Sequence, residues 1–147
     1  MTIRILQPAL AALAFAGALA MAVPATAAVT TYKATMTSAA EVPPNDSKGT
    51  GTVTATFDDA TKKLSWKGSY SNLSGAATAA HFHGPAEPGK NAGVLIPVFA
   101  GAAAKSPFEG EAVLTDAQAS DLAAGRLYFN IHTDKNKGGE LRGQMTK

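Results

Sequence analysis

Apolar and polar residues alternate in short stretches along most of the chain, and each stretch ends at a cluster of turn residues. In residues 50–57, Val53, Ala55 and Phe57 alternate with threonines, which is the period of a half-buried β-strand. Similar runs bounded by Gly, Pro, Asn or Asp predict eight strands in all, at residues 29–37, 50–57, 63–70, 77–83, 94–99, 108–114, 126–133 and 139–146. Pro97 has no N–H for a β-ladder, so its strand is expected at an edge or a bulge.

One short helix is expected between the sixth and seventh strands. Thr115 can cap its N-terminus, and Gln118 stands three residues later, which is the spacing of a capping box. Gly125 is placed to end the helix because glycine readily takes a positive φ. Evenly spaced strands joined by polar turns predict an all-β fold, either a two-sheet Greek-key sandwich or a flattened barrel of about eight strands with one short helix.

The first 27 residues have the pattern of a cleaved signal peptide rather than part of the fold. Arg4 gives a positive start, residues 9–23 are apolar, and small residues at Ala25 and Ala27 suit a signal peptidase. An uncleaved anchor is the alternative, but the apolar run is shorter than the roughly 20 residues that span a bilayer. We therefore expect a signal peptide at 1–27, a single domain at 28–147, no membrane span after cleavage, and a periplasmic or secreted location.

Composition removes several classes of function. The 147 residues suit one domain, and 13 basic against 11 acidic residues give a net charge of +2. The basic residues never form a run, which argues against binding to nucleic acid. Because the chain has no cysteine, disulfides, thiolate metal sites and cysteine nucleophiles are excluded. No Gly-x-Ser-x-Gly signature is present either, and no residue is assigned a catalytic role.

The three histidines carry the strongest chemical signal. His81 and His83 are two positions apart in one predicted strand, so their imidazoles project from the same face, opposite Ala80 and Phe82. His132 also lies on the polar side of its own strand. If the two strands are neighbours, the three side chains form a metal site suited to Cu²⁺, with Zn²⁺ as the alternative. The competing interpretation is that all three histidines are structural or surface residues.

Charged residues near the C-terminus allow two interpretations. Glu140 and Arg142 share a strand face, where they predict either a group that orients a histidine ligand or a solvated cross-strand ion pair. The ion pair is the favoured interpretation. Glu41, just before two prolines, is expected to hold a loop by accepting hydrogen bonds from the backbone.

Four motifs, taken together and in order, resemble the chordin (CHRD) domain family over roughly residues 32–145. They are Ala-Glu-Val-Pro-Pro at 40–44, Ala-Ala-His-Phe-His-Gly-Pro-Ala at 79–86, Leu-Thr-Asp-Ala-Gln at 114–118, and the run from Gly125 to Gly143 that includes Asn-Ile-His-Thr and Gly-Gly-Glu-Leu-Arg-Gly. The family includes animal chordins, which bind secreted growth factors, and single-domain exported bacterial proteins. The resemblance implies an extracytoplasmic β-sandwich binding module and names no ligand.

A fainter similarity is to copper/zinc superoxide dismutase, which also takes copper ligands from a His-x-His strand and a late-strand histidine. This similarity would give the three copper-ligand roles to His81, His83 and His132. The chain departs from that family because it has no fourth histidine, no residues for a zinc cluster and no cysteine pair. The similarity supports a copper-type site and not superoxide dismutation.

Three functions remain open at this point. The first is an exported, non-catalytic protein that binds a copper-type ion through His81, His83 and His132. The second is a module that recognises an extracytoplasmic protein or glycan, with structural histidines. The third is a redox enzyme with an open mononuclear copper site.

Overall fold

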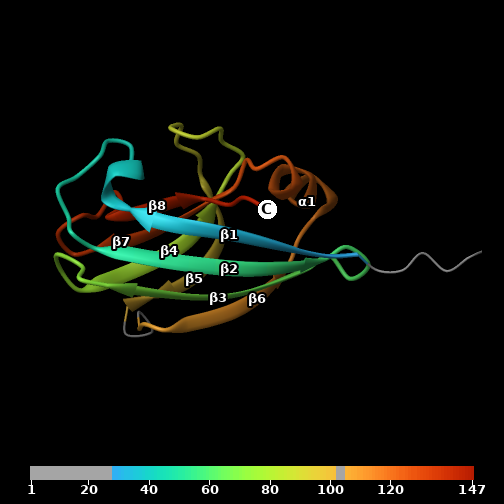
Figure 1. Cartoon of the computed structure of the whole chain (residues 1–147), viewed down its shortest axis with the longest axis horizontal. Helices are drawn as coiled ribbons and strands as arrows, with labels where there is room; N and C mark the ends of the chain where they lie inside the picture. Colours follow the sequence, from blue (N-terminus) through green and yellow to red (C-terminus); the bar gives the residue numbers. More distant parts are fainter. Residues whose placement is uncertain (1–27, 102–104) are drawn as a thin grey trace, which may run out of the picture.

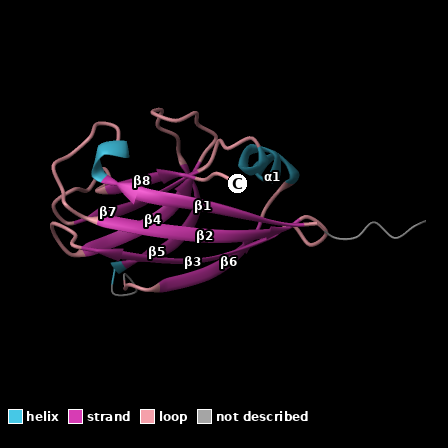
Figure 2. Cartoon of the chain, viewed as in Figure 1, coloured by secondary structure: helices cyan, strands magenta, loops and turns pink. Residues whose placement is uncertain are grey.

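The computed structural model describes residues 28–101 and 105–147, and the predicted signal peptide at 1–27 lies outside these residues. Figure 1 shows the path of the described chain, and Figure 2 shows that strands make up most of it. The elements in chain order are β1 (Val29–Thr37), the 3₁₀-helix η1 (Ser38–Ala40), β2 (Thr50–Asp58), β3 (Lys63–Ser71), β4 (Ala77–His83), β5 (Val94–Ala100), β6 (Phe108–Val113), α1 (Asp116–Ala123), β7 (Tyr128–Thr133) and β8 (Leu141–Gln144).

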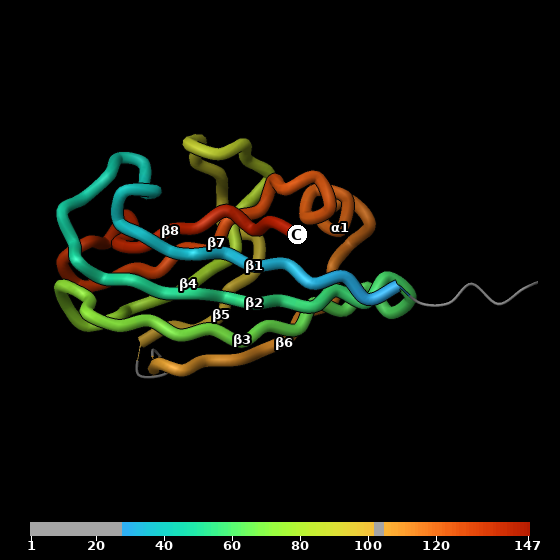
Figure 3. Tube along the Cα trace, viewed as in Figure 1, coloured from blue at the N-terminus to red at the C-terminus, as the bar shows by residue number. Residues whose placement is uncertain are grey.

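All eight strands belong to one antiparallel sheet with the order β5-β4-β7-β8-β1-β2-β3-β6. The last strand, β8, therefore lies beside the first, β1, as the tube in Figure 3 shows. The sheet curls until its two edge strands approach each other, with the rings of Phe99 in β5 and Phe108 in β6 5.4 Å apart. The all-β prediction is confirmed, and the architecture is the flattened, nearly closed barrel.

The alternation of the sequence decides which side chains fill the barrel. Val53, Ala55 and Phe57 are buried, while the threonines between them are exposed. Phe82 makes edge-to-face contacts with Trp66 and Phe129, with ring centroids 5.1 and 4.8 Å apart. Edge-to-face packing suits the quadrupoles of aromatic rings and adds to the stabilisation that burial provides. The inward faces of the strands thus form one continuous apolar core.

The last two strands are shorter than predicted. β7 begins at Tyr128 instead of residue 126, and β8 covers Leu141–Gln144 instead of 139–146. The chain before β8 is a tight turn in which Gly139 has a φ of +137° and donates its N–H to the Asn136 carbonyl. Glycine adopts this φ without the steric strain that a side chain would meet, so the turn delays the start of the strand.

The predicted features of the helix and of the edge strand are confirmed. Thr115 and Gln118 exchange both hydrogen bonds of a capping box at the start of α1, and Gly125 follows the helix with a φ of +71°. Figure 1 shows α1 at one end of the barrel. Pro97 lies in the edge strand β5, beside a register shift in the β4–β5 ladder. In the described part of the chain, no helix is long and apolar enough to cross a membrane.

Candidate metal centre

The sheet brings together the three histidines that the sequence singled out. β4 and β7 are hydrogen-bonded neighbours, and their register pairs Ala79 with His132 and His81 with Asn130. Ala80 and Phe82 point into the core, so His81 and His83 project from the outer face of the barrel. One potential ligand atom from each histidine lies within 4.8 Å of the others. The grouping of His81, His83 and His132 is confirmed, whereas metal binding by the group stays a prediction.

The spacing of two ring nitrogens suits ligands of one ion. His81 Nδ1 and His132 Nε2 are 3.1 Å apart. Metal–nitrogen bonds of about 2.0–2.1 Å place two imidazole nitrogens on the same ion about 3 Å apart. The same contact is a hydrogen bond when no ion is bound, with one nitrogen protonated and the other accepting. A metal ion can therefore take the place of the shared proton between His81 Nδ1 and His132 Nε2 with little movement of the two rings.

Backbone carbonyl groups orient two of the imidazoles. His83 Nδ1 lies 3.1 Å from the Ala92 carbonyl oxygen, and His132 Nδ1 lies 2.9 Å from that of Lys137. A carbonyl oxygen only accepts, so in both histidines Nδ1 carries the proton and Nε2 keeps its lone pair. Metal-ligating histidines usually donate their other ring N–H in this way, which fixes the tautomer and the ring orientation.

His83 Nε2 is the atom in the group without a hydrogen-bond partner. It is buried, and within residues 28–101 and 105–147 no protein group bonds to it. A buried polar atom left unpaired costs about 1–3 kcal/mol, so such an atom calls for a partner, which can be a bound water or an ion. A metal ion shared with His81 and His132 would give this lone pair its partner.

The surroundings of His81 and His83 favour the neutral form of their imidazoles, which metal binding requires. The pKa of His81 is lowered to about 4, mainly by burial, with smaller effects of the same sign from the neighbouring His132 and His83. Burial is also the main cause that lowers the pKa of His83, and the Arg142 charge adds a smaller effect of the same sign. At neutral pH both imidazoles are therefore neutral, and each keeps one ring nitrogen free to bind a metal ion.

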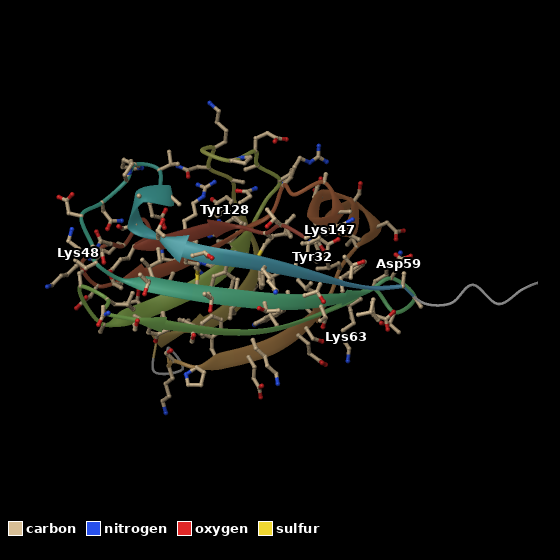
Figure 4. All side chains as sticks on the ribbon, in the orientation of Figure 1. Tyr32, Lys48, Asp59, Lys63, Tyr128 and Lys147 are labelled. Atoms are coloured by element: carbon tan, nitrogen blue, oxygen red, sulfur yellow. The ribbon has the colours of Figure 1, made fainter. Side chains whose placement is uncertain are left out.

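A stack of side chains supports His83 from behind. The Tyr128 ring is parallel to the His83 ring, with centroids 4.8 Å apart and planes 2° apart. The guanidinium carbon of Arg142 lies 3.5 Å from the Tyr128 centroid. Figure 4 labels Tyr128, which lies on the side of the barrel that carries the 84–93 loop.

The 84–93 loop closes over this stack. Arg142 donates to Asn91 Oδ1 and to the Lys90 carbonyl, at 2.9 and 2.5 Å. The Tyr128 hydroxyl donates to the Ala92 carbonyl at 3.2 Å. Ala92 thus accepts from both Tyr128 and His83, so one loop residue fixes the ligand and its supporting ring together.

Comparison with known families identifies this fold. The family model of the CHRD domain matches residues 32–145, which is most of the chain. The chain belongs to the CHRD-domain family. No curated protein and no solved structure matches it.

The CHRD domain holds Glu140 in a way that the sequence did not predict. Glu140 is fully buried, and its carboxylate accepts hydrogen bonds from Ser47, Ser74, Thr133 and Asn136. Burial opposes ionisation, but the bonds from Ser47, Thr133 and Ser74 outweigh it and lower the pKa to about 2. The solvated ion pair of Glu140 with Arg142 is therefore wrong, because both side chains are buried and the described residues form no ion pair between them.

Glu41 of the CHRD domain is buried as well and accepts a hydrogen bond from the Asn130 side chain. Burial raises its pKa to about 7, against smaller opposing effects of the Arg142 charge, the Val42 backbone and Asn130. Asn130 pairs with His81 in the β4–β7 register and with Arg142 in the β7–β8 register. Glu41 therefore contacts the residue that separates His81 from Arg142. Sequence reasoning missed Tyr128 and Asn130, although both share the outer-face parity of His132.

Proposed function

We propose that this CHRD-domain protein is an exported, non-catalytic protein that binds one copper-type metal ion through His81, His83 and His132. The observation that carries the proposal is the buried His83 Nε2, which lacks a hydrogen-bond partner in the described residues and belongs to the three-histidine group. Three neutral imidazoles suit copper and zinc, which both accept nitrogen ligands readily. Copper is the preferred ion, and zinc is the alternative.

A titration of the domain tests this proposal. We expect one equivalent of Cu²⁺ or Zn²⁺ to bind to residues 28–147 at pH 7.5, with nitrogen hyperfine coupling in the copper EPR spectrum. Uptake should weaken at low pH because protons compete for the imidazoles. Replacing His132 by alanine should remove the hyperfine pattern and lower the affinity by roughly 100-fold or more, since a ligand is lost.

Lys137→Ala is the matched control for that titration. Lys137 is exposed, and only its backbone carbonyl contacts His132, so removing its side chain leaves the site intact. Cu²⁺ affinity that is equal in the wild type, His132→Ala and Lys137→Ala would contradict the three-histidine site. The histidines would then be structural, and a protein or glycan partner would become the leading function.

Catalysis requires a separate observation. An open coordination position alone does not make an enzyme, because rate acceleration needs groups that stabilise a transition state. Turnover of superoxide or peroxide by the metal-loaded protein would move the proposal to a copper redox enzyme. The absence of turnover in a preparation with one bound copper would support a binding role.

The N-terminal sequence supports export of the protein to the periplasm or the medium. The apolar run at 9–23 and the small residues Ala25 and Ala27 form the cleavage pattern, which leaves a chain that begins at Ala28. We expect the intact mass of the protein from the exported fraction to match residues 28–147. A mass that includes residues 1–27, found with the membrane fraction, would instead indicate an uncleaved anchor.

A further inference from the structure

The positive charge of Arg142 is buried directly behind the metal centre. The side chain is only 2% exposed, and in the part of the chain that the structure describes it forms no ion pair. Its two hydrogen bonds end on neutral acceptors, the Asn91 amide oxygen and the Lys90 carbonyl. A buried charge without a counterion keeps most of its electrostatic influence, because little water screens it.

Two stacked rings connect this charge with a proposed ligand. Arg142 lies 3.5 Å from the centroid of Tyr128, and Tyr128 lies parallel to His83 with a separation of 4.8 Å. The guanidinium is therefore separated from the His83 imidazole by a single aromatic ring. Any ion bound through His83 would feel the positive charge of Arg142.

The proposed ligands do nothing to offset that charge. All three are imidazoles, which bind metals in their neutral form, and the group contains no carboxylate. One acidic group with a described link to the stack is Glu41, which contacts Asn130 between His81 and Arg142. Glu140, two positions before Arg142 in the chain, is a second buried carboxylate, and it is unchanged in every variant compared below. The three ligands therefore add no negative charge that would offset the repulsion between a bound metal ion and Arg142.

We propose that Arg142 makes the three-histidine site select Cu⁺ over Cu²⁺. The inference rests on the proposed metal binding and names the oxidation state that the site prefers. Repulsion from Arg142 is twice as large for a dication as for a monocation. If the Arg142 charge and the bound ion are about 10 Å apart at an effective dielectric constant of about 20, Coulomb's law predicts that each positive charge on the ion lowers its binding affinity roughly 15-fold. On this proposal the site binds divalent ions but holds Cu⁺ more tightly than it would without the Arg142 charge.

Two substitutions of Arg142 separate its charge from its shape. We expect Arg142→Met to lower the ratio of Cu⁺ affinity to Cu²⁺ affinity by roughly 15-fold, which lowers the reduction potential of the bound copper by about 70 mV. Arg142→Lys keeps the charge and should keep most of the ratio. Affinities are measured by competition with chelators at pH 8, anaerobically for Cu⁺, and circular dichroism checks that each variant is folded.

Glu41→Gln gives the opposite test. At pH 8 the Glu41 carboxylate is ionised, since burial raises its pKa only to about 7, and it offsets part of the Arg142 charge. Its removal should raise the ratio of Cu⁺ to Cu²⁺ affinity several-fold. Lys67→Met is the control for Arg142→Met, because it also removes one positive charge. Lys67 is exposed on β3, away from β4 and β7 in the sheet order, so this variant should leave the ratio unchanged.

The outcomes distinguish this inference from the proposed function. If neither copper ion binds the wild type, the proposed metal site itself is wrong. If copper binds and Arg142→Met leaves the ratio unchanged, the site stands and the role of Arg142 is overturned. An equal loss of the ratio in Arg142→Met and Arg142→Lys would also overturn it, because the effect would then be one of shape. If Arg142→Met does not fold, a ratio in Glu41→Gln equal to or below the wild-type value decides against the inference.

Discussion

Replacing Glu140 by alanine is expected to lower the free energy of unfolding by at least about 3 kcal/mol at pH 7. The buried carboxylate accepts from the hydroxyl of Ser47 at 2.6 Å, the N–H and hydroxyl of Ser74 at 2.6 and 2.8 Å, and the hydroxyl of Thr133 at 2.6 Å. Asn136 adds a bond at 3.2 Å. Alanine would leave these donors without their acceptor, and each unsatisfied buried donor costs about 1–3 kcal/mol.

The same carboxylate makes stability depend on pH. In the unfolded chain Glu140 has the ordinary pKa of 4.5, whereas in the fold its hydrogen bonds outweigh burial and lower the pKa to about 2. The contribution of the ionised group is therefore complete above pH 4.5 and is lost as the pH falls towards 2. The difference in pKa corresponds to about 3 kcal/mol between these limits.

Urea unfolding at pH 7 and pH 3 measures both effects. Glu140→Gln keeps the size of the side chain and removes its ionisation, so part of the acid sensitivity of the wild type should disappear in this variant. Glu87→Ala is the matched control because Glu87 is exposed in the 84–93 loop, and its removal should change stability by less than about 0.5 kcal/mol. Equal stabilities of Glu140→Ala and Glu87→Ala would contradict a structural role for the Glu140 carboxylate.

The fold was predictable to the extent that it depends on local pattern. The alternation of Val53, Ala55 and Phe57 with threonines assigns an inner and an outer face without any knowledge of neighbours. The capping box of α1 is equally local, because Thr115 and Gln118 bond only to each other's backbone. The order of the strands was not predictable, since β3 pairs with β6 and β4 with β7 across long stretches of chain.

The candidate site shows the same division. Strand parity placed all three histidines on the polar face, but their meeting depends on the pairing of Ala79 with His132, which alternation does not specify. The exposed ion pair predicted for Glu140 and Arg142 failed for a related reason. Parity shows that a side chain leaves the core, but the 84–93 loop covers Arg142, and Ser47, Ser74 and Asn136 from three other loops surround Glu140. Covering loops have no periodic signature.

Replacing His83 by phenylalanine is expected to abolish metal binding without a loss of stability. Phenylalanine preserves the flat ring that stacks on Tyr128, and the Ala92 carbonyl keeps the hydrogen bond from the Tyr128 hydroxyl. The substitution removes one hydrogen bond, from His83 Nδ1, and also a buried Nε2 for which the described residues offer no partner. The two effects are of similar size, about 1 kcal/mol against about 1–3 kcal/mol.

Affinity and stability together decide between a ligand and a structural histidine at position 83. A ligand role predicts a fall in copper affinity of at least roughly 100-fold, with a free energy of unfolding within about 1 kcal/mol of the wild type. A structural role predicts the reverse, a loss of stability with copper affinity unchanged, and that result would contradict the metal centre. His83 would then be a residue that stabilises the metal-free fold. If instead His83→Phe is as stable as the wild type and binds no copper, the imidazole has no structural benefit in the metal-free fold, and ion binding is the physical reason for a histidine there.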